Sequence, residues 1–209
     1  MGDNEPVSLA FLVTAFVVVA TPGTGALLSI AAGLRSGPRR SLVTAFGCTL
    51  GIIPHLMAAI TGAAALLRAG GLAFDVVKIL GVAYLLSMAW SMWRDTGVLT
   101  VQAPVRPSCA TRTIISAVLA NLLNPKLTLF FFAFLPQFVS PRATHPILQM
   151  VELSAVFMLM TFVVFAFYGL FAGAARSHLI ERPAIIRRLE RIFSLTFLGL
   201  AGKLATTTR

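Results

Sequence analysis

Apolar residues run along this chain in long stretches, and most of the charged residues lie in the connections between them. Six of these stretches are long enough to cross about 30 Å of hydrocarbon as helices. The predicted spans cover residues 7–34, 41–67, 72–93, 113–139, 147–175 and 185–204. The pattern therefore predicts an all-α integral membrane protein with six transmembrane helices.

The longest connection, residues 95–112, divides the six predicted spans into two sets of three. The first half covers about 7–94 and the second about 113–204, within a single membrane transporter domain of residues 1–209. Because each half contains an odd number of spans, the second half enters the membrane from the opposite side. We therefore expect two inverted three-helix halves.

The composition agrees with a membrane protein. Of the 209 residues, 57% are hydrophobic and 11% are charged, whereas soluble domains are about 25% charged. The net charge of +10 comes from basic residues placed mainly between apolar stretches, which is typical of topology signals and not of a nucleic-acid-binding face. We expect the lipid bilayer as a partner, and no nucleic acid.

The positive charges also predict an orientation. Eleven arginines lie in or next to the connections that follow the first, third and fifth predicted spans, against five Lys or Arg residues assigned to the other side. The positive-inside rule places the arginine-rich connections in the cytoplasm and both termini outside. Residues 1–6 contain Asp3 and Glu5 but no basic residue, so we expect the first span to be retained and not cleaved as a signal peptide.

Lys126 lies at the centre of the fourth predicted span, directly after Asn124 and Pro125. It lies about 20 Å from each end of that span, and a charge at the bilayer centre costs about 2.5–3.5 kcal/mol. Pro125 also interrupts the helical hydrogen bonds. A buried charge beside broken backbone is typical of a transport path. The alternative is a kinked helix whose lysine leans on a neighbouring carbonyl.

A second interruption lies in the first predicted span, at Pro22 and Gly23, followed by Thr24 and Gly25. Interrupted helices at corresponding positions of two halves indicate the binding site of a transporter. The amides that follow Gly23 would then face a substrate carboxylate, although an ordinary kink would have the same sequence. We expect the two breaks to meet near the middle of the membrane.

Several other polar or small residues lie within the predicted spans. His55 has two open roles, as a carrier of a coupling proton or as a neutral ring bonded to a neighbouring helix. Glu152 is expected at the interface, with a solvated gate as the alternative, and Tyr168 fits interface anchoring. Two GxxxG pairs serve close helix packing and also permit a homodimer; they are Gly47 with Gly51 and Gly169 with Gly173.

No motif of an enzyme is present. The chain lacks the zinc-protease, nucleophile-elbow and phosphate-loop patterns, so we expect no catalytic residues and no cofactor. Cys48 and Cys109 are 61 residues apart, without metal-ligand spacing, and we expect no metal site. Without a nucleotide-binding motif, uphill transport must use an ion gradient or a partner.

Over nearly all its length the chain resembles the LysE/RhtB family of amino-acid exporters. The most specific match is the segment NLLNPK at 121–126 followed by FLPQF at 134–138. Weaker matches are the early PG pair, the basic turn at 35–40, the glycine and histidine spacing of 47–55, and GVAYL at 81–85. The resemblance implies a multi-pass exporter of amino acids or their derivatives in the bacterial plasma membrane, driven by the proton gradient.

The chain departs from the family pattern at two positions. Thr24 stands where the second proline of the early motif usually stands, which is a mild change because Pro22 alone supplies the break. Ile52 stands where many relatives carry an aspartate. The role of that position in cation binding or proton coupling is therefore in doubt for this chain.

These observations predict that a zwitterionic amino acid binds where the two breaks meet. Its carboxylate would face Lys126 and the amides after Gly23, while Asn121, Asn124 and helix carbonyls receive its ammonium. The predicted substrate-binding residues are Pro22, Gly23, Thr24, His55, Asn121, Asn124, Pro125 and Lys126.

The absence of an obvious buried acid favours neutral substrates such as homoserine, threonine or branched-chain amino acids over lysine or arginine. A transporter of metal ions or of a thiol carrier would need buried carboxylates or paired cysteines. A non-transporting membrane subunit would have no use for a lysine at mid-span. These alternatives stay open at the level of sequence.

Overall fold

A computed structural model describes residues 7–21, 23–69, 109–139 and 144–174, with isolated helical positions between 79 and 90 and between 195 and 202. All regular elements among the described residues are helical. The α-helices are α1 (Leu9–Ala20), α2 (Thr24–Ser36), α3 (Pro38–Leu50), α4 (Ile53–Ala69), α6 (Ala110–Leu122), α7 (Pro125–Leu129) and α8 (Pro146–Ala174). A π-helical turn (Phe130–Phe134) and a 3₁₀ turn (Leu135–Phe138) continue α7.

Two helices in the described part are long and apolar enough to cross a membrane, namely Pro38–Gly62 and Pro146–Ala174. Two further pairs qualify if each bent pair is one span: Leu9–Ala20 with Thr24–Ser36, bent by 52°, and Ala110–Leu122 with Lys126–Phe138, bent by 57°. These four correspond to the first, second, fourth and fifth predicted spans. The third and sixth, at 72–93 and 185–204, lie outside the described residues except for isolated positions.

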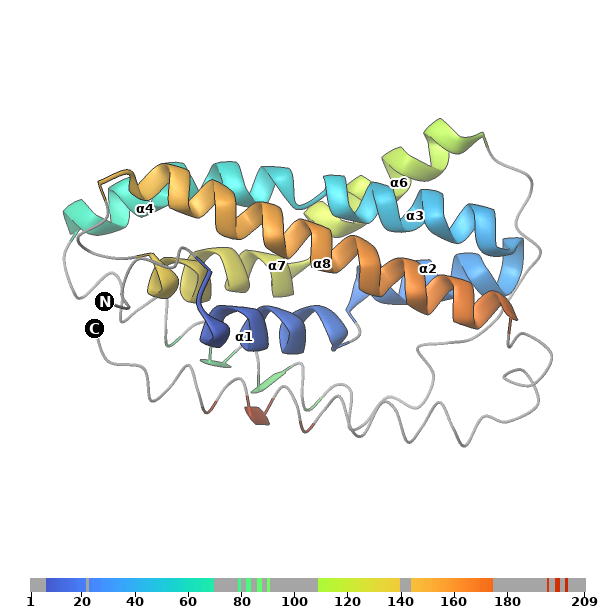
Figure 1. The fold of residues 1–209 in the computed structure, drawn as a ribbon, viewed down its shortest axis with the longest axis horizontal. Helices are drawn as coiled ribbons and strands as arrows, with labels where there is room; N and C mark the ends of the chain where they lie inside the picture. The colour runs from blue at the N-terminus through green and yellow to red at the C-terminus, as the bar shows by residue number, and fades with distance from the viewer. Residues whose placement is uncertain are drawn as a thin grey trace.

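The two bent spans run in opposite directions (Figure 1). Near the start of α1, the ring of Phe11 meets that of Phe138, beyond α7, at a centroid distance of 5.4 Å. Near the end of α1, Val18 contacts Lys126 at the start of α7. Helix α1 of the first span therefore lies antiparallel to the second half of the fourth span.

Small residues allow the helices around α8 to approach closely. A Cβ added to Gly33 of α2 would lie 2.0 Å from the carbonyl oxygen of Gly169, and one added to Gly169 would lie 2.4 Å from Cβ of Ser41 in α3. Gly47 of α3 and Gly51, which caps α3, pack in the same way against α6. Both GxxxG pairs are thus used for packing within the chain, which confirms the packing prediction made for them.

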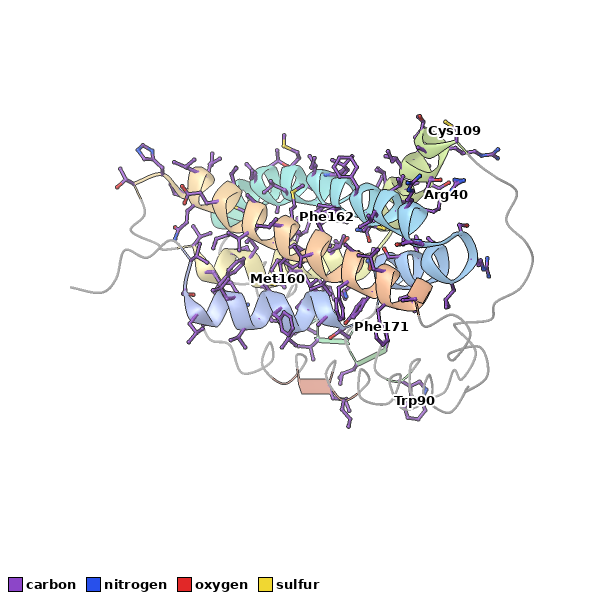
Figure 2. All side chains as sticks on the ribbon, turned by 45° about the vertical axis from the view of Figure 1, so that its right-hand side comes forward. Arg40, Trp90, Cys109, Met160, Phe162 and Phe171 are labelled. Carbon is purple, nitrogen blue, oxygen red and sulfur yellow. The ribbon has the colours of Figure 1, made fainter. Side chains whose placement is uncertain are left out.

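Polar residues connect the helices at one end of the bundle. Arg40, in the first turns of α3, donates from Nη1 to the Thr113 hydroxyl of α6 at 2.9 Å. Figure 2 shows Arg40 and Cys109 together at this end, where α3 and α6 begin. The turn from α2 to α3 lies at the same end and contains Gly37 with a φ of 84°, a conformation that glycine adopts without strain.

We predict that Gly33→Ala destabilises the bundle, because the added methyl group would meet backbone that has no room to move. Overpacking of this kind costs about 1–3 kcal/mol. Gly173→Ala is the matched control, since its Cβ would approach no atom closer than 3.3 Å. Thermal unfolding of the purified variants in detergent measures the difference. Equal unfolding temperatures for Gly33→Ala and the wild type would contradict the packing described.

Candidate functional site

The C-terminal end of α1 lacks one backbone donor because of Pro22. In a continuous helix the carbonyl of residue 18 accepts from the N–H of residue 22, and proline has no N–H. The Val18 carbonyl instead accepts a hydrogen bond from Nζ of Lys126 at 2.8 Å. The same Nζ donates to the Thr21 carbonyl at 2.6 Å. Lys126, from the other broken span, therefore caps α1.

Other side chains complete this carbonyl end. The Tyr168 hydroxyl of α8 donates to the Ala20 carbonyl at 2.6 Å. The Thr21 hydroxyl and backbone N–H both donate to the Val17 carbonyl, at 2.6 Å and 3.1 Å. Carbonyls at the end of a helix need such partners when water is excluded. The end of α1 is thus held by groups from α7 and α8.

Lys126 is a buried cation without a carboxylate beside it in the described part of the chain. Its side chain is 4% exposed. Glu152 is the sole acidic residue among the described positions, and it lies exposed on α8. The ammonium is stabilised instead by carbonyl dipoles at the negative end of α1. An ammonium has three N–H donors. Two of them donate to these carbonyls, and the third has no partner in the described part of the chain, where it could bind an anion.

The start of α2 lies against the tip of this lysine. Gly23 is the N-cap of α2 and provides no side-chain cap, and the first helical bond is from Leu27 N to the Gly23 carbonyl. The amides of residues 24–26 are therefore not used by the helix. A Cβ added to Gly23 would lie 3.3 Å from Nζ of Lys126. Free amides at a helix start, beside an ammonium, favour an anion.

The second break has the same origin as the first. Pro125 leaves the carbonyl of Asn121 without its usual donor, and Nε2 of His55 lies 3.1 Å from that oxygen. The N–H of Asn124 also donates to it, at 3.0 Å. On its other side the ring contacts the Thr128 hydroxyl, with 3.3 Å between Nδ1 and Oγ1. His55 therefore bridges the two sides of the break.

The tautomer of a neutral His55 follows from these contacts. A carbonyl oxygen can only accept, so Nε2 must carry the hydrogen that is donated to the Asn121 carbonyl. Nδ1 then accepts from the Thr128 hydroxyl. Both ring nitrogens thus have partners within the protein, in agreement with the interpretation of His55 as a ring bonded to a neighbouring helix.

The two asparagines form a polar chain through the break. Asn124 caps α7 by accepting from the Lys126 backbone N–H at 3.1 Å, and its amide donates to Oδ1 of Asn121 at 3.0 Å. The Asn121 amide donates to the Cys48 carbonyl of α3 at 2.6 Å. A Cβ added to Gly25 would lie 2.8 Å from Oδ1 of Asn121. The ends of α2, α3, α6 and α7 thus converge on Asn121.

The structure brings most of the predicted site residues together. Gly23, Asn121, Asn124 and Lys126 adjoin one another, and His55 contacts both sides of the second break. Thr24 begins α2 with an exposed side chain. Pro22 and the side chain of Pro125 lie outside the described residues.

Sequence reasoning named helix carbonyls without identifying those of α1. It placed Tyr168 at an interface, with a deeper hydroxyl as the alternative. The signal for Val18 was a proline four residues later, which identifies the carbonyl that loses its donor. The position after the second glycine of α3 is also clear in the structure. Ile52 is fully buried in the apolar core, so this position provides no charge.

Comparison with known proteins identifies the family. The LysE type translocator model matches residues 16–208. A Vibrio cholerae protein described as an uncharacterized membrane protein is 34% identical and covers 95% of this chain and 96% of its own. A homoserine/homoserine lactone efflux protein of Salmonella typhimurium is 26% identical, with 96% of both chains covered.

A leucine efflux protein of Enterobacter is 27% identical, with 94% of this chain and 93% of its own covered. No solved structure matches the chain significantly. The chain therefore belongs to the LysE type translocators and is a multi-pass membrane protein.

We predict that His55→Gln retains near-wild-type stability and transport, because the glutamine amide can donate to the Asn121 carbonyl in place of Nε2. His55→Ala removes that donor and should lower stability by about 1–2 kcal/mol. Unfolding temperatures and transport rates, measured between about pH 5 and 8, where a histidine can change charge, compare the two variants. The prediction is contradicted if His55→Gln stays folded but its transport no longer changes with pH as that of the wild type does. The ring would then carry a proton as well as bridge the break.

Proposed function

We propose that this LysE-family chain exports neutral amino acids across the bacterial plasma membrane, driven by the proton gradient. Family membership supports a translocator, and the relatives named above for homoserine, homoserine lactone and leucine support amino acids or their derivatives as substrates. The sequence has no nucleotide-binding motif, and of the two remaining sources of energy, an ion gradient or a partner, we propose the gradient.

The observation that carries the proposal is the position of the Lys126 ammonium between the two breaks. Its remaining N–H and the amides of residues 24–26 would bind a substrate carboxylate. Asn121, Asn124 and helix carbonyls provide oxygens for the ammonium of the substrate. Pro22, Gly23 and Pro125 shape the two breaks, Thr24 begins α2, and His55 holds the second break.

The charge of the site favours neutral substrates. A zwitterion adds no net charge to a site that contains one lysine, whereas lysine or arginine as substrate would bring a second cation. Glu152 is exposed and Ile52 is apolar, so neither compensates that charge in the described part. Burying an uncompensated charge costs several kcal/mol, which disfavours basic amino acids.

The proposed topology has six spans in two inverted halves, with both termini outside. The opposite directions of the two bent spans support the inversion. Arg40 binds Thr113 where α3 and α6 begin, and the turn after α2 with Arg35 and Arg39 lies at the same end. These arginines belong to the set that the positive-inside rule assigns to the cytoplasm.

One observation favours a different class, a membrane subunit that does not transport. Two of the three Lys126 donors already satisfy carbonyls of α1, as expected for a purely structural lysine. Such a role needs hydrogen-bond donors at this position but no substrate. The two functions therefore differ in what happens to efflux when Lys126 is replaced.

We predict that Lys126→Ala strongly lowers efflux, because the carboxylate loses its cationic partner. Cells without their own exporters are loaded with a leucine- or threonine-containing dipeptide, and release of the free amino acid is followed at matched expression. Loss of a buried charged hydrogen bond of about 1.5–3 kcal/mol corresponds to a decrease of about tenfold or more. Lys126→Arg should retain part of the activity, and Glu152→Gln, at an exposed acid, should retain all of it.

Unchanged efflux from cells that express Lys126→Ala would exclude the lysine from the mechanism and favour the structural role. The absence of any amino-acid release above background with wild-type protein would contradict the proposed function itself.

A further inference from the structure

We propose that the carbonyl end of α1 is the subsite for the ammonium of the substrate, and that Lys126 occupies it in the empty carrier. An incoming amino acid displaces the lysine from the Val18 and Thr21 carbonyls onto its own carboxylate. This inference rests on the proposed function and specifies how each charge of the zwitterion is bound.

The carbonyl end of α1 already binds an alkylammonium. Nζ of Lys126 lies 2.8 Å from the Val18 carbonyl oxygen and 2.6 Å from that of Thr21. The α-ammonium of an amino acid presents the same three donors on one nitrogen. Groups that satisfy the lysine would therefore satisfy a substrate ammonium equally well. The Tyr168 hydroxyl donates to the Ala20 carbonyl, so the exchange involves only the carbonyls of Val18 and Thr21.

The charges of the lysine and the substrate must also balance. Two ammonium groups cannot share one pair of carbonyls, because like charges at contact repel strongly. The lysine must therefore move when a substrate ammonium binds, and it then needs an anion. In the described part of the chain the nearby groups are carbonyls, amides, hydroxyls and the His55 ring, not carboxylates. The carboxylate of the substrate is thus the anion that the exchange itself delivers.

The exchange needs little movement of the Lys126 side chain. The tip of Lys126 lies beside the N-cap of α2, where a Cβ on Gly23 would be 3.3 Å from both Cε and Nζ. A carboxylate held by the amides of residues 24–26 would therefore lie close to Nζ. The flexible stem of lysine allows its ammonium to turn from carbonyls to carboxylate without a shift of α7.

This exchange would make Lys126 select for zwitterions. A ligand that has an ammonium but no carboxylate would displace the lysine and leave it without an anion. A ligand that has a carboxylate but no ammonium would leave the lysine on the carbonyls. Both half-ligands should therefore bind more weakly than the complete amino acid.

The test uses the purified full-length protein, with thermal stabilisation by ligand as the binding measurement and leucine as the probe. For wild-type protein we expect leucine to bind at least about tenfold more tightly than isoamylamine or N-acetylleucine, since each analogue lacks one buried charged contact. For Lys126→Gln, where the carbonyls keep amide donors but the competing cation is gone, the order should reverse so that isoamylamine binds more tightly than leucine. Lys126→Met repeats the comparison without any donor.

N-acetylleucine binding within about threefold of leucine, less than 1 kcal/mol, would overturn the ammonium subsite. Isoamylamine remaining weaker than leucine in both Lys126→Gln and Lys126→Met would overturn the displacement. If the wild-type protein binds none of the twenty amino acids, the proposed function fails and the inference fails with it. If the wild-type protein binds leucine no more tightly than either analogue, the inference fails and the proposed function stands.

Discussion

Two prolines set the main constraint on this structure, because each removes one backbone N–H from a membrane-spanning helix. Pro22 leaves the Val18 carbonyl without its donor, and Pro125 does the same to the Asn121 carbonyl. No water in a bilayer core can replace these donors. The protein uses Lys126 for the first carbonyl and His55 for the second. The side chains that stabilise the broken backbone are therefore a lysine and a histidine, both of which can carry a positive charge.

This double use connects packing to mechanism. The glycines at positions 25, 33 and 51 bring α2 and α3 close to α6 and α8, and this proximity allows one lysine to reach the first break from the second. A charge that is expensive in a membrane is stabilised by the carbonyl end of one half-helix. The ammonium of Lys126 also lies beside the N-terminal amides of α2. The same few groups therefore offer binding positions for both charges of an amino acid.

Much of this arrangement could be predicted from the sequence. Hydrophobic run length predicted four helical segments that the structure describes, and Pro22, Pro125 and Lys126 indicated two breaks that meet. Pro22 marks the Val18 carbonyl as lacking a donor. That Lys126 of the other broken span would supply the donor could not be predicted, because a backbone carbonyl has no side-chain signature. The contact of Tyr168 with Ala20 depends on the rotation of α8 about its axis, which the hydropathy of the helix does not reveal. The position of His55 predicted a polar role but not which carbonyl it would satisfy.

The most direct test is an experimental structure of the protein in a lipid nanodisc, determined once without substrate and once with bound leucine. The account predicts Nζ of Lys126 on the Val18 and Thr21 carbonyls in the empty protein. With leucine bound, it predicts that the substrate ammonium takes those carbonyls and that Nζ pairs with the substrate carboxylate. A leucine bound elsewhere, or a lysine whose contacts do not change, would contradict the account.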